Sequence, residues 1–421
     1  MYFEHTVIQN FKSIRNMEIA FKPGVNLLIG DNGAGKTSIL EALTIALGGY
    51  LEGITGVSTR GIRQTDVRIE RTPIADASVD LQYATPVDIE SRVIADGDTY
   101  TWHRRRQDES GSSKTKTVGR EIAKYAKEIS GSGNMLPLLS YLSTSRVFLF
   151  KREDYGASLK KKLNDRRRGY LGCLDDTLDI KAIKHWCVEM ELTAFQKNEP
   201  ICEYELFKNT VSVFMQKMNN LDDAPQVFYS RVFEDIVYAE GKTSVPIAYL
   251  SAGYQSLLWI AMNLAYRAVL LNPEMTDMKQ LSGIVLVDEL DMHLHPKWQW
   301  SALDALRAIF PKVQFIVATH SPILISSCKD ANLIRIGDDQ EIEYLPSAYA
   351  YSVEDVLELR QTSTAIPVEI RDLSNRFEAA LNDDDYSLAR MIYEEMLQKY
   401  GPDNSQVKSA RFELDLEEDG E

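Results

Sequence analysis

Cysteine is scarce in this 421-residue chain. It has four cysteines, and no two of them form a C-x-x-C pair. Zinc ribbons and fingers need such pairs, and a disulfide framework needs an oxidising compartment. We therefore expect reduced thiols and no structural zinc site at these positions, which are Cys173, Cys187, Cys202 and Cys328.

Long apolar runs are also missing. No uninterrupted hydrophobic stretch approaches the roughly 20 residues that span a bilayer. The first residues, Met1–His5, lack the basic region and the apolar core of a secretory signal. We expect a protein that works in the cytoplasm and does not cross a membrane.

Positive charge is in the minority, with 47 Lys and Arg against 62 Asp and Glu. The net charge of −15 argues against a surface that binds nucleic acid everywhere. Two local basic clusters remain, Arg104–Arg106 and Lys160–Arg168. The first is equally typical of DNA or RNA phosphate contacts and of a solvated or salt-bridged surface. The second, with two basic triplets close together, favours binding to DNA, RNA or a partner.

Nuclease chemistry is absent as well. The sequence has no HNH-like His-Asn-His pattern, and the segment after His320 has no acidic cluster on strands of the kind a Toprim nuclease uses. Heptads are not sustained, which excludes a long coiled-coil arm, and no segment repeats at a fixed period. Any cleavage reaction would therefore depend on a partner protein.

What the sequence does contain is a phosphate-binding loop. Gly30–Thr37 reads G-x-x-x-x-G-K-T, between an apolar strand pattern at 25–29 and a helical pattern that follows. Backbone N–H groups of such a loop converge on phosphate oxygens, and the helix N-terminus adds positive charge. Lys36 would reach the β- and γ-phosphates, and Thr37 would ligate Mg²⁺. The predicted nucleotide-binding residues are Asn32, Gly33, Ala34, Gly35, Lys36, Thr37 and Ser38.

A second apolar strand pattern, Ile284–Val287, ends in Asp288 and Glu289. The carboxyl ends of parallel strands form the ligand-binding edge of an α/β sheet. Asp288 suits Mg²⁺, directly or through water. Glu289 suits a general base for the water that attacks the γ-phosphate, a role typically worth about 10²–10⁴-fold in rate.

Two further segments extend this pattern. A buried strand pattern at 315–319 leads to His320, which we interpret as a γ-phosphate sensor, and Asp291 is placed to bridge two nucleotide sites. Leu250–Gln255 reads L-S-x-G-x-Q before an apolar helix. Ser251 and Gly253 would make a second anion site at that helix N-terminus, although such a segment is also an ordinary helix cap.

The order of these motifs resembles the ABC-type ATPases of the RecF and SMC group. The stretch from Leu250 to Ser326 is similar to the PtuA-type ATPases of bacterial anti-phage defence, known from Septu and retron systems. The resemblance implies an α/β fold: an ABC-type P-loop ATPase head with a mixed sheet, helices and a β-lobe, plus a helical insert and a C-terminal helical tail.

The resemblance also implies a mechanism. Two heads would enclose ATP and Mg²⁺, with Lys36 and Glu289 of one copy facing Ser251 and Gly253 of the other. ATP hydrolysis would control a separate HNH-type nuclease; the alternative is a RecF-like DNA-binding ATPase of repair. The third signature position is Ala252 instead of glycine. The usual Mg²⁺-contacting glutamine is not evident, with Gln64, Gln82 and the segment 140–144 as candidates.

The pattern of elements predicts four regions. Residues 1–150 would form the first half of the head, with the phosphate loop and an antiparallel β-lobe. Residues 151–240 would form a helical insert, and residues 241–350 the second half of the head. Residues 351–421 would form a helical tail, whose predicted helices are 352–360, 368–381, 385–400 and 405–416.

Overall fold

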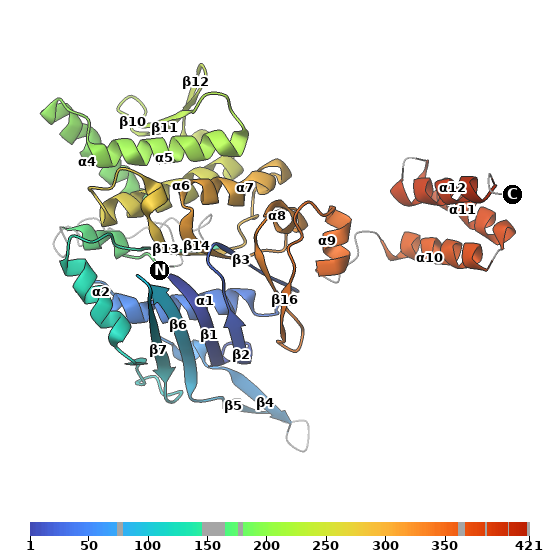
Figure 1. Ribbon diagram of the computed structural model, residues 1–421, viewed down its shortest axis with the longest axis horizontal. Helices are drawn as coiled ribbons and strands as arrows, with labels where there is room; N and C mark the ends of the chain where they lie inside the picture. The colour runs from blue at the N-terminus through green and yellow to red at the C-terminus, as the bar shows by residue number, and fades with distance from the viewer. Residues whose placement is uncertain are drawn as a thin grey trace. The chain divides into compact units, whose positions relative to one another are not determined.

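The computed structural model describes residues 1–73, 79–144, 165–175, 180–360, 367–383, 385–402 and 404–418. The chain divides into two compact units, Met1–Ser352 and Val353–Glu421 (Figure 1). The first unit carries every motif identified in the sequence.

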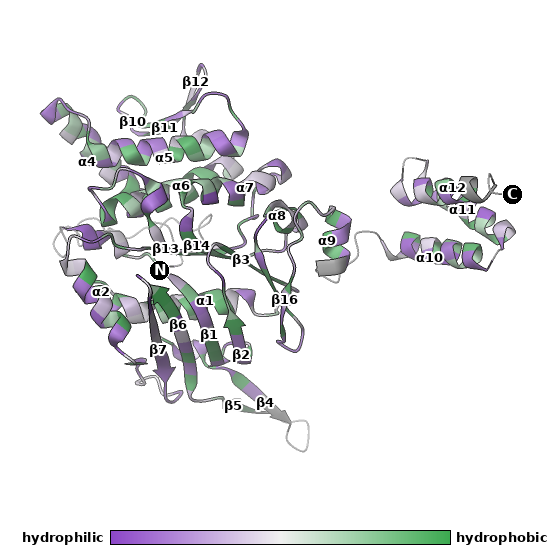
Figure 2. Cartoon of the chain, viewed as in Figure 1, coloured by the Kyte–Doolittle hydropathy of each residue, from purple (hydrophilic) through white to green (hydrophobic). Residues whose placement is uncertain are grey.

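The centre of the first unit is a six-stranded sheet in the order β16-β15-β3-β14-β13-β9. Strands β15, β3, β14, β13 and β9 run parallel, and β16 joins the edge antiparallel. The inner strands are buried on both faces, as expected for near-continuous apolar runs, and they are green in Figure 2. The strands are β3 (Val25–Gly30), β9 (Leu138–Leu142), β13 (Ser282–Asp288), β14 (Lys312–Ala318), β15 (Asn332–Ile336) and β16 (Ile342–Leu345).

A five-stranded antiparallel sheet, in the order β2-β1-β6-β7-β8, forms the predicted β-lobe. The Asp96-Gly97 pair turns β6 into β7 with φ values of 51° and 92°, which an Asp-Gly turn favours. A separate two-stranded sheet, β4-β5, lies in the same part of the sequence. These strands are β1 (Tyr2–Phe11), β2 (Ile14–Ala20), β4 (Ile69–Pro73), β5 (Val79–Tyr83), β6 (Val87–Ala95), β7 (Asp98–Arg106) and β8 (Lys116–Val118).

Helix α1 (Lys36–Leu51) lies between the two sheets. It contacts β3, β13 and β14 of the parallel sheet, and β1, β6 and β7 of the antiparallel one. Burial on two sides explains why the helix is apolar around most of its circumference. Trp102 of β7 donates its indole N–H to the carbonyl of Ala46 at 3.0 Å, which fixes the helix to the lobe. Helix α2 (Glu121–Gly131) packs against α1 and β7.

The other face of the parallel sheet carries α6 (Ala252–Leu271) and α7 (Pro296–Ile309), with α4 (Ile180–Lys197) and α5 (Cys202–Asn219) outside them (Figure 1). The expectation that the insert is helical through residue 240 is wrong for its last part. Residues 226–246 form a three-stranded antiparallel sheet of β10 (Gln226–Ser230), β11 (Asp235–Glu240) and β12 (Thr243–Pro246). Valines, isoleucine and aromatic residues dominate these strands, and such residues favour extended backbone.

The described residues of the second unit contain four helices, close to the predicted ranges: α9 (Val353–Arg360), α10 (Val368–Asn382), α11 (Tyr386–Tyr400) and α12 (Ser405–Glu418). Helices α10 to α12 share a hydrophobic core of their own, which includes Phe377, Ile392 and Val407. Asp385 caps α11 by accepting a hydrogen bond from the Leu388 N–H at 3.0 Å. None of the helices in the described residues is long and apolar enough to span a bilayer.

Candidate nucleotide-binding site

The phosphate loop connects the end of β3 to the start of α1, as the motif requires. Its backbone depends on glycine at two points. A Cβ on Gly30 would lie 2.5 Å from the carbonyl oxygen of Ile336, and Gly35 precedes α1 with a φ of 107°. Both positions would be strained with any residue other than glycine, so this path of the loop requires glycine at both.

Lys36 bends back over this loop. Its ammonium group donates hydrogen bonds to the carbonyls of Gly30 at 2.7 Å and Asp31 at 2.8 Å. Burial lowers the pKa of Lys36 from that of a free lysine, while the negative charges of Asp31, Asp288 and Glu289 act in the opposite direction. The geometry holds a cation beside the converging N–H groups, where a phosphate chain would need it.

Thr37 and Asp288 meet at the head of α1. The Thr37 hydroxyl donates to Asp288 Oδ1 at 3.2 Å, although 251 positions separate the two residues. Asp288 ends β13 and is 1% exposed. Hydroxyl and carboxylate oxygens are the hard ligands that Mg²⁺ prefers, with phosphate and water supplying the rest. This pair therefore fits the expected metal.

Glu289 and Asp291 follow Asp288 at the same edge of the sheet. Glu289 adopts a φ of 48°, uncommon for a residue other than glycine, and its N–H donates to the Ala318 carbonyl at 3.0 Å. Asp291 accepts a hydrogen bond from the Thr319 hydroxyl at 2.5 Å. The ends of β13 and β14 are thus tied together beside Lys36.

His320 directly follows Thr319 and is half-buried. Burial is the main cause that lowers the pKa of His320 below that of a free histidine, and the charge of Lys36 adds to it. The carboxylates of Glu289, Asp291 and Asp31 act in the opposite direction. The imidazole is therefore neutral at pH 7 and can donate one hydrogen bond.

Ser251 and Gly253 lie at the N-terminus of α6. Ser251 is the helix cap, and its side chain accepts from the Tyr254 N–H at 3.5 Å. A Cβ on Gly253 would lie 2.7 Å from Trp298 Cζ3 and 2.9 Å from the His293 carbonyl oxygen. Helix α6 and helix α1 cover opposite faces of the parallel sheet (Figure 1). The two predicted anion sites therefore begin helices that cover opposite faces of the sheet.

The other residues of the predicted phosphate loop lie between the end of β3 and the first turn of α1. Asn32, Gly33 and Ala34 form the turn, with the Ala34 N–H 3.2 Å from the Asp31 carbonyl oxygen. Ser38 Oγ is 3.5 Å from Ser13 Oγ on the turn between β1 and β2.

The candidates for the Mg²⁺-contacting glutamine lie in different parts of the fold. Strand β9 pairs in parallel with β13, with Leu142 opposite Val287, so Ser143 follows at the edge that bears Asp288. Gln64 lies on a short 3₁₀ helix and Gln82 on β5, both outside the parallel sheet.

Sequence reasoning missed Thr319 as a site residue. Its hydroxyl both bonds Asp291 and accepts the Ser321 N–H at 3.0 Å. The signal in the sequence was the Thr-His-Ser run at the end of a buried strand. A hydroxyl group at that point has few hydrogen-bond partners other than groups at the end of the neighbouring strand.

The reading of Arg104–Arg106 as an open nucleic-acid surface is wrong. Arg104 and Arg106 are 1% and 3% exposed, because alternation along β7 turns both inward. Arg105 points outward, but it pairs with Asp88 at 2.8 Å, as does His103 at 3.0 Å. Arg104, which pairs with Glu52, and Arg105 fit the salt-bridged alternative, whereas Arg106 bonds backbone carbonyls.

The second cluster is structural where it is described. Arg166 donates to the carbonyls of Ile129, Ser132 and Asn134, and so caps the end of α2. Arg167 pairs with Asp165 at 2.6 Å. Lys160–Lys162 lie outside the described residues, so their part of the prediction stays a prediction.

Comparisons with known proteins find ATPase domains and relatives named as ATPases. A family model described as "AAA domain" matches residues 7–203, and one described as "AAA ATPase domain" matches residues 158–325. The chain is similar in structure to an SMC head crystallised with the C-winged helix domain of ScpA. The TM-score is 0.52 at 17% identity, over 82% of this chain and 98% of that one.

Sequence relatives cover most of the chain. A retron Vc95 probable ATPase of Vibrio cholerae is 26% identical over 84% of this chain and 78% of its own length. A Septu protein PtuA of Bacillus thuringiensis is 24% identical over 90% of this chain and 88% of its own. A RecF protein of Lactobacillus acidophilus is 44% identical, but over only 10% of this chain and 12% of its own.

The fold is that of an ABC-type ATPase head, and the order of the motifs resembles that of the RecF and SMC group. Within that group, its sequence is similar to retron ATPases and to Septu protein PtuA over most of its length. Both parts of the resemblance inferred from the sequence are confirmed.

Proposed function

We propose that two copies of this chain enclose ATP, hydrolyse it, and use the cycle to control a separate effector nuclease in anti-phage defence. The observation that carries the ATPase assignment is the meeting of Lys36, Thr37 and Asp288 at one sheet edge. The defence role is supported by similarity to retron and Septu proteins along 84% and 90% of the chain.

Each residue at this edge has a role that its position supports. The loop N–H groups and Lys36 would hold the phosphates, and Thr37 and Asp288 would hold Mg²⁺. When bound, Mg²⁺ neutralises charge that develops on the phosphate oxygens. Glu289 accepts a proton from the attacking water, and neutral His320 donates a hydrogen bond toward the γ-phosphate. Ser143 stands at the place of the missing glutamine.

A second copy would use Ser251 and Gly253, which begin a helix on the opposite face of the sheet from α1. An anion-binding helix end that does not serve its own phosphate loop can serve another copy. In a two-fold dimer, each ATP would lie between the phosphate loop of one head and the α6 N-terminus of the other. Asp291, held by Thr319, would lie between the two sites.

A partner must supply any cleavage of nucleic acid. The sequence has no HNH pattern, and the described residues hold no group of three His, Cys, Asp or Glu side chains that could bind a metal ion. Similarity to PtuA favours an HNH-type nuclease as that partner.

The test of the ATPase is Glu289→Gln. This variant should bind ATP with Mg²⁺ and remain dimeric with it, while hydrolysis falls by at least about a hundredfold, since the general base is lost. Phosphate release and light scattering measure the two effects. Hydrolysis at the rate of the unsubstituted protein would reject the assignment of Glu289.

The alternative, a RecF-like repair ATPase, is less well supported because the RecF similarity covers only 10% of the chain. It predicts that gapped or broken DNA alone accelerates hydrolysis strongly. The defence proposal predicts instead that nuclease activity appears only when the chain and its partner are combined, and that it depends on Lys36.

A further inference from the structure

A polar cavity of about 610 Å³ opens in the β-lobe, away from the phosphate loop. Its volume lies within the range of small-molecule sites, roughly 300–1,000 Å³. Glu52, at the far end of α1, lines it, and 16 residues separate Glu52 from Lys36, or ~24 Å at 1.5 Å per residue. The segments 59–64 and 111–115 complete the wall with β7. The cavity is therefore distinct from the phosphate loop.

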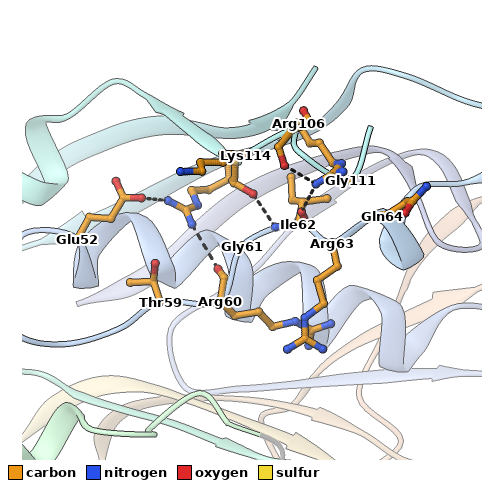
Figure 3. Close-up of a pocket in the computed structure, with 13 residues that line it drawn as sticks. Glu52, Thr59, Arg60, Gly61, Ile62, Arg63, Gln64, Arg106, Gly111 and Lys114 are labelled. Carbon is orange, nitrogen blue, oxygen red and sulfur yellow. Dashed lines mark hydrogen bonds and ion pairs between the residues drawn. The ribbon is translucent and has the colours of Figure 1, made fainter. Parts of the chain in front are cut away.

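Five cations line this cavity in a chain whose net charge is −15. In Figure 3, Lys114 and Arg106 lie in the upper part of the view, and Arg60 and Arg63 lie in the lower part. Two of the five are neutralised by carboxylates. Arg60 pairs with Asp66 and Glu41, and Arg104 pairs with Glu52.

The other cations lack such partners. The buried Arg106 guanidinium donates to the carbonyls of Asp108, Ile62, Ser113 and Ser110, all of them neutral. Within the residues that the structure describes, no ion pair joins Arg63 or Lys114 to a carboxylate. In addition, Arg104 Nε is buried without a hydrogen-bond acceptor. An excess of positive charge beside an N–H donor without an acceptor favours the binding of an anion.

We propose that this cavity is a second anion site, which takes a small ligand carrying phosphate groups, such as a free nucleotide, separately from the ATP of the phosphate loop. Arg104 and Arg106 line the cavity although they are only 1% and 3% exposed, which favours a small ligand over an extended strand. Arg63 and Lys114 at the exposed mouth would contact the phosphates first. The site does not depend on dimer formation.

The experiment uses the full chain with Lys36→Ala, which removes phosphate binding by the loop. Titration calorimetry with inorganic pyrophosphate should show saturable binding. Adding Arg63→Ala with Lys114→Ala should weaken it at least about tenfold, since two charged donors are lost. Both residues are exposed, so folding should not suffer. Lys116→Ala, an exposed lysine outside the cavity, is the matched control and should change nothing.

Parallel titrations with AMP, adenosine and a 5′-phosphorylated DNA 12-mer identify the source of the phosphate. Binding of pyrophosphate and AMP, but not adenosine, supports the proposal. The proposal is overturned if pyrophosphate does not bind saturably, if binding survives the double substitution, or if only the DNA 12-mer binds.

Discussion

At the scale of single residues, His320 is the group whose ionisation we expect to shape the activity. Its pKa lies below that of a free histidine because burial and the charge of Lys36 disfavour the imidazolium. The imidazole should therefore stay neutral down to a pH below the ordinary histidine value, near 6.5.

The predicted pH profile follows from the lowered pKa of His320. ATP turnover should be level from pH 7 to 8, and an acid limb from His320 should begin only below the ordinary histidine pKa. His320→Gln keeps a hydrogen-bond donor but cannot titrate in this range, so it should lose that limb while retaining some activity. Steady-state turnover against pH measures both proteins, and an acid limb centred above pH 7 in the unsubstituted chain would contradict the prediction.

Gly253 is a second residue whose identity the structure explains. Gly253→Ala would place a methyl group 2.7 Å from Trp298 Cζ3 and 2.9 Å from a backbone oxygen. The backbone cannot yield as a flexible side chain can, so the N-terminus of α6 must shift. ATP turnover should fall at least about tenfold, because misplaced binding groups lose orientation.

Ala252→Ser, at the exposed neighbouring position, is the control for Gly253→Ala and should leave turnover nearly unchanged. Equal turnover in all three proteins would show that the α6 N-terminus has no part in the reaction. Circular dichroism separates a displaced helix end from general unfolding.

At the scale of elements, strand β7 shows how alternation decides the use of charge. Arg106 joins β7 to Ile62 and to the loop at 108–113 through backbone carbonyls, whereas Arg105 on the opposite face makes a half-exposed ion pair. The same three-arginine sequence therefore contains one outward and two inward side chains.

Arg106→Ala should destabilise the head by about 2–4 kcal/mol, because it leaves buried carbonyls without donors. Arg105→Ala should cost at most about 1 kcal/mol, as exposed ion pairs do. Urea unfolding of the two variants makes the comparison. Similar losses would show that the inward and outward positions are not distinguished as the structure indicates.

At the scale of the whole molecule, the proposed dimer makes a prediction that no single head can satisfy. Lys36→Ala and Ser251→Arg should each abolish turnover. In a mixed dimer both defects fall in one site, and the other site has an intact phosphate loop and an intact α6 N-terminus. An equal mixture should recover about a quarter of the original turnover, since half of the dimers keep one of two sites.

Complementation should depend on protein concentration, as dimer formation does. Mixing Lys36→Ala with Glu289→Gln is the control. Lys36 and Glu289 both act on the ATP that is held by the phosphate loop of their own copy. Each of the two sites in a mixed dimer therefore has one defect, and no turnover should return. Failure of the first mixture to recover any turnover would reject composite sites.

Several features of this protein follow from the sequence alone. The phosphate loop, the strand ending in Asp288 and Glu289, the Asp96-Gly97 hairpin and the four tail helices depend on local spacing, turn chemistry and periodicity. These are short-range properties, and one chain segment contains all the information they need.

Tertiary structure decided the rest, because the deciding contacts join distant segments. Thr37 meets Asp288 across 251 positions only through the order of the parallel strands. The inward turn of Arg104 and Arg106 depends on which face of β7 is covered by α1 and the loop at 59–64. The strands at 226–246 interrupt a helical region because of pairing between neighbours that helical spacing cannot reveal. Composition fixed how much charge the chain carries, and only the fold determined where that charge is buried and where it is free to bind.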